Sequence, residues 1–144
     1  MNKRQEYISR SPEETFSLGQ KLAATLKGGE ILAFFGDLGA GKTAFVQGLA
    51  VGLGVKKIVN SPTFTILKVY PVKKGKIKQL CHIDAYRLSQ GKELLDIGAG
   101  DYLGAVDTVS AVEWAERVLE ILPNKVVTIN IKNISLNVRK IIIK

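Results

Sequence analysis

Residues 36 to 43 read Gly36-Asp37-Leu38-Gly39-Ala40-Gly41-Lys42-Thr43 and match the phosphate-binding pattern G-x-x-x-x-G-K-T at every fixed position. Apolar residues 31–35 come directly before this loop and predict a buried strand. Residues 44–53 follow it with apolar side chains at helical spacing. The loop therefore connects a predicted strand to a predicted helix, which is the context that the pattern requires. We expect a nucleoside triphosphate to bind here together with magnesium.

The loop also predicts which groups hold the triphosphate. Glycine lets backbone N–H groups close around phosphate oxygens, and the positive end of the helix dipole strengthens the attraction. We expect the Lys42 amine to reach the β- and γ-phosphates and the Thr43 hydroxyl to join the magnesium shell. The predicted nucleotide-binding residues of this segment are Gly36, Asp37, Leu38, Gly39, Ala40, Gly41, Lys42, Thr43 and Ala44.

Length and composition limit the class of protein. The chain has 144 residues, of which 46% are hydrophobic, and this suits one well-packed domain over residues 1–144. No apolar run approaches the roughly 18 residues of a membrane span. Residues 1–6 also lack the apolar core of a signal peptide, so we expect a cytoplasmic protein without membrane contact. The single cysteine, Cys81, excludes an internal disulfide and indicates a buried thiol.

The charge balance is basic, with 21 Lys and Arg against 13 Asp and Glu and a net charge of +8. Such a surface could bind RNA. The favoured interpretation is a solvated hairpin whose charges keep an edge strand from aggregating, because Tyr70 alone offers an aromatic ring for stacking. The basic charge thus permits nucleic-acid binding without identifying it. Five of the lysines fall within eleven residues: Lys68, Lys73, Lys74, Lys76 and Lys78.

The order of predicted elements indicates the fold. Ser11-Pro12-Glu13-Glu14 combines an N-cap serine, a proline at the first helical position and a glutamate at the third, so a helix begins there and ends before residues 28–29. This order, with the loop described above, predicts an α/β fold, a three-layer P-loop NTPase sandwich with a mixed central sheet. The later segments are a hairpin (65–70 and 77–84), a short helix (92–97), a strand (108–112), a short helix (115–122) and two closing strands (125–131 and 136–143).

A triphosphate hydrolase also needs a carboxylate near the magnesium and a group that positions the attacking water. Glu113 follows an apolar strand, where the metal-binding acid of such folds lies, so it is the candidate metal ligand, directly or through water. Asp84 is the candidate that orients or deprotonates water. His82 projects from the same strand face as Asp84 but is a poor ligand for a hard ion. Each of these residues also has a purely structural interpretation. Glu113 could be an exposed strand end, Asp84 a turn cap and His82 an ordinary hydrogen-bonded histidine.

Three further residues are predicted to contact the nucleotide. Thr63 lies in a Ser-Pro-Thr-Phe loop, and its hydroxyl could sense the γ-phosphate or could belong to a turn. Ser11 and Asn133 are candidates for the adenine pocket, because ligands gather at the carboxyl ends of the strands in such folds.

Four segments resemble the bacterial TsaE (YjeE) family of ATPases in their order and spacing. The resemblance implies a small cytoplasmic ATPase that helps to make threonylcarbamoyladenosine in tRNA, working with the proteins TsaD and TsaB, with ATP turnover needed for repeated cycles. Whether the chain touches tRNA directly stays open. The segments are 36–43, Ser61-Pro62-Thr63-Phe64-Thr65, His82-Ile83-Asp84-Ala85-Tyr86-Arg87-Leu88 and Val112-Glu113-Trp114-Ala115-Glu116-Arg117.

The resemblance also implies site roles. Lys42 and Thr43 would bind phosphate and magnesium, and Glu113 would serve the magnesium. Asp84 and Trp114 would act near the nucleotide, and Thr63 would belong to a switch-like loop. The catalytic residues are then Asp84, Lys42 and Glu113. The chain departs from the family at Ala85, where leucine is common, and residues 98–104 are only loosely similar.

Other functions were weighed against an ATPase. A GTPase would need N-K-x-D, and Asn124-Lys125-Val126-Val127 lacks the aspartate. A small-molecule kinase shares the loop but would need an acceptor pocket and an arginine lid, and neither is evident. An RNA-binding module rests on the basic charge alone. Neither Arg87 nor Arg117 is identified as an arginine that stabilises the transferring phosphate, so we expect slow turnover that rises with a partner.

Overall fold

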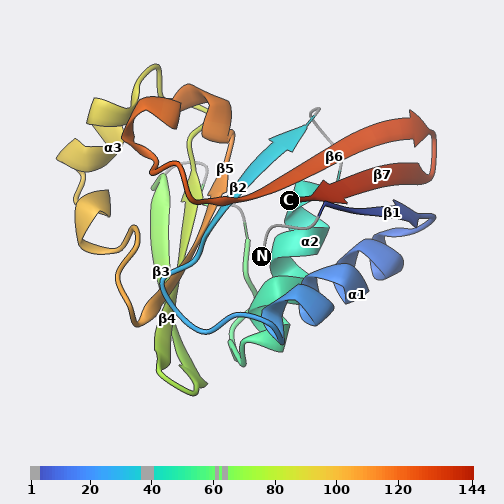
Figure 1. The fold of residues 1–144 in the computed structure, drawn as a ribbon, viewed down its shortest axis with the longest axis horizontal. Helices are drawn as coiled ribbons and strands as arrows, with labels where there is room; N and C mark the ends of the chain where they lie inside the picture. Colours follow the sequence, from blue (N-terminus) through green and yellow to red (C-terminus); the bar gives the residue numbers. More distant parts are fainter. Residues whose placement is uncertain (1–3, 37–40, 61, 63–64) are drawn as a thin grey trace.

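The computed structural model describes residues 4–36, 41–60, 62 and 65–144. Within these residues, seven strands form one mixed sheet in the order β1-β7-β6-β2-β5-β4-β3 (Figure 1). The central strands run parallel to one another, whereas β1 pairs with β7, β7 with β6 and β3 with β4 in antiparallel fashion. The strands are β1 (Gln5–Ser9), β2 (Ile31–Gly36), β3 (Leu67–Lys74), β4 (Ile77–Asp84), β5 (Thr108–Glu113), β6 (Val127–Ser135) and β7 (Val138–Ile143).

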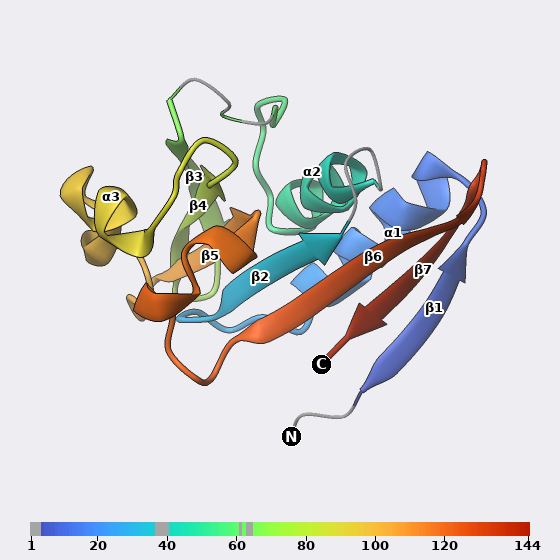
Figure 2. The ribbon, with the colours of Figure 1, turned by 90° about the horizontal axis from the view of Figure 1, so that it is seen from above.

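Two helices, α1 (Pro12–Ala23) and α2 (Lys42–Gly52), lie side by side along one face of the sheet (Figure 2). The predicted N-cap serine begins α1, because the Ser11 hydroxyl accepts from the Glu14 N–H at 3.1 Å. The Glu14 carboxylate accepts from the Arg10 N–H at 2.8 Å, one residue before the N-cap, so the predicted capping box is only half formed. Glycine lets the two helices touch. A Cβ on Gly48 would lie 1.9 Å from the Phe16 carbonyl oxygen, closer than any real contact.

The opposite face carries short helices. They are α3 (Gly91–Asp96) and the 3₁₀ turns η1 (Ala99–Asp101), η2 (Ala115–Arg117) and η3 (Leu119–Ile121), and Figure 1 shows α3 well apart from α1 and α2. Their apolar side chains pack on strands β2, β4 and β5 to form a second core. The predicted three-layer sandwich is therefore confirmed, with its third layer built from short pieces. Buried members of this core include Ile31, Ala33, Cys81, Ile83, Leu94, Ala99, Val112, Ala115 and Val118.

Some predicted elements were wrong in detail. Strand β1 was not predicted, since its five residues are mostly exposed and acquire strand geometry by pairing with β7. The helix predicted over 115–122 is instead the two turns η2 and η3, separated at Val118, whose backbone (φ −132°, ψ 21°) is neither helical nor extended. The first strand of the hairpin continues past Tyr70 to Lys74 with an irregularity between Pro71 and Lys74.

The lysine-rich hairpin forms one edge of the sheet, because β3 is the last strand in the order. One of its lysines contacts a residue outside the hairpin, and another contacts an aromatic ring within it. The Lys74 amine donates to the Leu26 carbonyl at 3.2 Å, and the Lys68 amine lies 5.4 Å from the Tyr70 ring centre. An edge strand rich in lysine resists pairing with another chain, which agrees with the favoured interpretation of this cluster. No helix among the described residues is long and apolar enough to span a bilayer.

Candidate functional site

The candidate site lies where parallel strands end. Asp84 and Glu113 are the last residues of β4 and β5, and they are paired in the register of these two strands. Glu113 is also level with Phe34 of β2, two residues before Gly36. Because the carboxyl ends of parallel strands meet at one edge of the sheet, the phosphate loop and both acidic candidates emerge at the same edge.

The strand alternation decides which face these side chains occupy. Leu80 on β4 and Ala111 on β5 belong to the core beneath α1 and α2. Side chains two residues further along a strand point to the same face, so His82, Asp84 and Glu113 all lie on the side of α2. The first residue of α2 is Lys42, the lysine of the phosphate-binding pattern.

Lys42 is buried, with 6% of its surface exposed. Its amine donates to the Gly36 carbonyl at 3.3 Å and lies 4.1 Å from the centre of the Trp114 ring. Across the described part of the chain, no carboxylate forms an ion pair with it. The described partners of this buried amine are a carbonyl and an aromatic face, so an anion beside it would gain a charge-assisted hydrogen bond.

Glycines shape the backbone on both sides of the loop. Gly36 ends β2 with φ 145°, and a Cβ there would lie 2.2 Å from the Ile131 carbonyl oxygen on β6. Gly41 caps α2 in the left-handed conformation, with φ 100° and ψ 14°. A larger residue at position 36 would displace β6, so the close approach of β2 and β6 explains the first glycine of the pattern.

Glu113 and His82 form a buried pair. The His82 Nε2 atom lies 2.6 Å from the Glu113 Oε2 atom. Their side chains are 1% and 5% exposed. His82 is thus hydrogen-bonded, as expected, and the structure identifies its partner as the candidate metal ligand. The alternative interpretation of Glu113 was an exposed strand end. Glu113 does end a strand, but it is buried, so that interpretation is wrong about its exposure.

Asp84 takes part in a turn. Its Oδ1 atom accepts from the Tyr86 N–H at 3.0 Å, the geometry of an Asx turn. Its own N–H donates to the Ile66 carbonyl at 2.8 Å, which ties the end of β4 to the segment before β3. The turn-cap interpretation of Asp84 is therefore confirmed. Since the residue is 6% exposed at the site edge, its predicted role toward water remains compatible with this bond.

Trp114 brings an aromatic ring to the same place. Its backbone is left-handed (φ 58°, ψ 42°), so the chain turns sharply straight after Glu113. The Trp114 ring lies 4.9 Å from the Tyr86 ring, and the Arg117 guanidinium carbon lies 5.4 Å from each ring centre. The indole therefore links Lys42 on one side to an exposed Tyr86–Arg117 group on the other.

The remaining predicted residues are placed less directly. Thr43 is exposed on the first turn of α2, and Ala44 is half-buried beside it. The Ser11 hydroxyl is used as the α1 cap, and Asn133 is exposed on β6, two residues beyond the partner of Gly36. Both adenine-pocket candidates stay predictions. Asp37, Leu38, Gly39, Ala40 and Thr63 lie outside the described residues.

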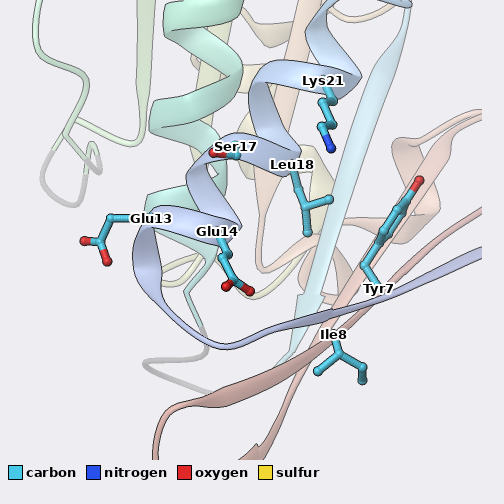
Figure 3. Close-up of a pocket in the computed structure, with 7 residues that line it drawn as sticks. All are labelled: Tyr7, Ile8, Glu13, Glu14, Ser17, Leu18 and Lys21. Atoms are coloured by element: carbon cyan, nitrogen blue, oxygen red, sulfur yellow. The ribbon is translucent and has the colours of Figure 1, made fainter.

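A hollow of about 340 Å³ lies between β1 and α1 (Figure 3). Figure 3 shows the carboxylates of Glu13 and Glu14 at its rim. Carboxylates repel phosphate oxygens, so this hollow does not suit the triphosphate. Its lining residues are Tyr7, Ile8, Glu13, Glu14, Ser17, Leu18 and Lys21.

Sequence reasoning missed the His82–Glu113 bond. The two-residue spacing of His82 and Asp84 indicated a shared face, but the partner of His82 lies 31 residues away on the neighbouring strand. Only the register of β4 against β5 brings the two together, and no local signal encodes that register.

Comparisons with known proteins agree with this geometry. The family model "Threonylcarbamoyl adenosine biosynthesis protein TsaE" matches residues 9–141. The tRNA threonylcarbamoyladenosine biosynthesis protein TsaE of Bacillus subtilis (strain 168) is 44% identical over 122 residues, covering 85% of this chain and 73% of that protein. Its namesake in Treponema pallidum (strain Nichols) is 41% identical, covering 87% of this chain and 89% of that protein.

A solved structure is similar over nearly the whole chain. The crystal structure of Bacillus subtilis YdiB matches with a TM-score of 0.81 and 37% sequence identity, covering 99% of this chain and 86% of that one. With the family match over residues 9–141, this similarity leads to one conclusion: the chain belongs to the TsaE family and has a P-loop fold.

Proposed function

We propose that this chain is a cytoplasmic ATPase that hydrolyses ATP to ADP and phosphate in support of threonylcarbamoyladenosine formation at position 37 of tRNA, acting with TsaD and TsaB. One observation carries the ATPase part of the proposal. The Lys42 ammonium is buried at the start of α2, has no carboxylate partner among the described residues, and lies beside the strand ends that bear Asp84 and Glu113. Family membership supports the tRNA part.

The residues present fit magnesium. Thr43 and Glu113 offer a hydroxyl and a carboxylate, which are the oxygen donors that this hard ion prefers. Among the described residues, no group of three or more His, Cys, Asp and Glu is arranged to hold a metal. Two protein ligands, Thr43 and Glu113, are enough for magnesium in such sites, because this ion usually takes its other ligands from phosphates and water. When bound, magnesium would supply positive charge that neutralises the phosphate oxygens.

Lys42 and the backbone amides at the start of α2 would bind the β- and γ-phosphates. The lysine gives up a carbonyl and an aromatic contact for a charged phosphate oxygen, and the new hydrogen bond is the stronger one. During hydrolysis the same ammonium would stabilise the charge on the transferring oxygens. Its contribution is therefore to binding and to the transition state.

Asp84 would orient the attacking water and accept its proton, directly or through a second water. The water oxygen forms a bond to the γ-phosphorus while the bond from that phosphorus to the bridging oxygen of ADP breaks. The Tyr86 N–H holds Asp84 Oδ1 at 3.0 Å and so limits rotation of the carboxyl group. A fixed carboxyl group loses less freedom on reaching the reactive geometry.

We expect isolated turnover to be slow. Arg117 lies over the rings of Tyr86 and Trp114, and neither it nor Arg87 is identified as an arginine that stabilises the transferring phosphate. A missing arginine of this kind is typically worth about 10³ to 10⁵ in rate. A partner protein that supplies or repositions such a charge would raise the rate.

The test is steady-state phosphate release from ATP, measured with the isolated chain and with the TsaD–TsaB complex added. We expect slow Mg²⁺-dependent release that the complex accelerates, and loss of release in Lys42→Ala. Lys92→Ala is the matched control, because Lys92 is an exposed lysine on α3 paired with Asp96. ATP affinity that survives Lys42→Ala would contradict the proposal, and phosphate transfer to a small molecule in place of water would favour the kinase alternative.

A further inference from the structure

We infer that His82 is a positioning residue for Glu113, holding one carboxylate oxygen so that the other is presented to the magnesium shell. This inference rests on the proposed function. The observation behind it is the contact of 2.6 Å between His82 Nε2 and Glu113 Oε2, with both side chains almost fully buried. Nothing in the phosphate-binding pattern requires a histidine here.

The strand register produces the contact. His82 is paired with Ala111 across β4 and β5, and Glu113 lies two residues further along on the same face. The side chain of Ala111 is a single methyl group. The Ala85 N–H also donates to the Glu113 carbonyl at 3.0 Å, so Glu113 is held at its backbone and at its side chain.

The chemistry of the pair specifies the tautomer. A carboxylate that binds magnesium is ionised and only accepts hydrogen bonds, so in that state His82 Nε2 would carry the proton and donate it to Glu113. The other ring nitrogen, Nδ1, is buried with no hydrogen-bond partner among the described residues. Burying an unpaired acceptor costs free energy, and an aliphatic side chain would fill this core position without that cost. Packing alone therefore does not account for a histidine at position 82.

Holding Oε2 restricts rotation of the Glu113 carboxyl group. Partners that orient a metal-binding side chain typically affect metal affinity or activity by about 10- to 100-fold. We therefore expect His82→Leu to raise the magnesium concentration needed for half-maximal nucleotide binding and hydrolysis by about 10-fold or more. Affinity for the nucleotide without magnesium should change less than about twofold, because Lys42 and the loop amides are untouched.

The chain offers two direct probes, since it contains one tryptophan and one histidine. Fluorescence of Trp114 reports nucleotide binding at each magnesium concentration. Nitrogen-15 NMR of the histidine ring reports which nitrogen carries the proton, without any change at position 82. We expect a protonated Nε2 and an unprotonated Nδ1, with a shifted Nε2 signal in Glu113→Gln. A ring protonated at Nδ1 alone would overturn the inference, and so would ring signals unchanged by Glu113→Gln.

Variants separate positioning from a structural role. His82→Gln keeps an N–H of similar reach and should recover most of the magnesium dependence lost in His82→Leu. In a Glu113→Gln background, His82→Leu should cause no further loss. Ile83→Val, a neighbouring core change on the opposite face of β4, should leave magnesium dependence as in wild type. Equal defects in His82→Gln and His82→Leu, or additive effects of His82→Leu and Glu113→Gln, would contradict positioning.

Failure of the proposed function gives a different result. A wild-type chain that neither binds ATP with magnesium nor releases phosphate, alone or with TsaD and TsaB, overturns the ATPase proposal and this inference with it. A wild-type chain that does both, while His82→Leu matches it at every magnesium concentration, overturns the inference alone.

Discussion

The Lys42 amine lies 4.1 Å from the centre of the Trp114 ring, within the range of a cation–π contact. Trp114 reaches this position because its left-handed backbone turns the chain straight after Glu113. The lysine of the phosphate loop and the residue that follows the candidate metal ligand are thus in direct contact. A phosphate that draws the amine away must change the surroundings of the indole.

Trp114 fluorescence should therefore respond to nucleotide. Trp114 is the sole tryptophan, so the signal has one source. We expect ATP with magnesium to change the emission in a saturable way, because the ammonium leaves the ring face. Lys42→Ala should abolish the change and Lys92→Ala should retain it. A saturable change that persists in Lys42→Ala would show that the indole senses something else.

Asp84→Asn should separate binding from hydrolysis. The asparagine side-chain oxygen can still accept from the Tyr86 N–H, so the turn should survive. The amide cannot take a proton from water, and we expect the turnover rate to fall by about 10²- to 10⁴-fold. Nucleotide affinity by Trp114 fluorescence should stay within about threefold. A turnover rate within a few-fold of wild type would remove Asp84 from the mechanism.

Two glycine substitutions test the approach of β2 to β6. Gly36 (φ 145°) and Gly54 (φ 89°) both have positive φ, but a Cβ on Gly36 would lie 2.2 Å from Ile131 O, whereas nothing lies within 4 Å of one on Gly54. We expect Gly54→Ala to lower the free energy of unfolding by about 1 kcal/mol. Gly36→Ala should lower it by about 3 kcal/mol or more, because the overlap adds to the conformational cost. Urea unfolding measures the free energy of unfolding of both variants. Equal losses in the two would contradict the steric overlap at position 36.

Cys81 should react slowly with thiol reagents while the protein is folded. Burial raises the pKa of the Cys81 thiol from 9.0 to about 12. Between pH 9 and pH 12 the Cys81 thiol is therefore ionised in the unfolded chain and neutral in the folded chain. The stability that the neutral thiol contributes is complete below pH 9 and is lost as the pH rises toward 12. Labelling at pH 7 to 10 should be slow in buffer and fast in denaturant, and fast labelling in buffer would contradict a buried thiol.

Local signals in the sequence predicted much of the fold. The strand before the phosphate-binding pattern and the helix after it were predicted correctly, because the pattern itself requires those neighbours. The N-cap serine at position 11 identified the start of α1, because its hydroxyl bonds within the first turn. Glu113 was correctly placed at the end of an apolar strand.

Features that depend on distant pairing were not predictable in this way. Strand β1 becomes a strand by pairing with β7, whose residues lie 130 to 138 positions further along the chain. The His82–Glu113 bond needs the register of two parallel strands. The left-handed turn at Trp114 occurs without the glycine or asparagine that commonly indicates one. The break at Val118, which divides the helix predicted over 115–122 into two short turns, likewise has no glycine or proline to indicate it.

The most direct test of the account is a crystal structure with magnesium and a non-hydrolysable ATP analogue. The account predicts that the Lys42 amine leaves the Gly36 carbonyl and the Trp114 ring for the β- and γ-phosphates. It also predicts Thr43 and Glu113 at the magnesium, Asp84 beside the γ-phosphate, and the His82–Glu113 bond intact. Phosphates bound away from the start of α2, or a Lys42 amine still on the Trp114 ring with the analogue in place, would contradict it.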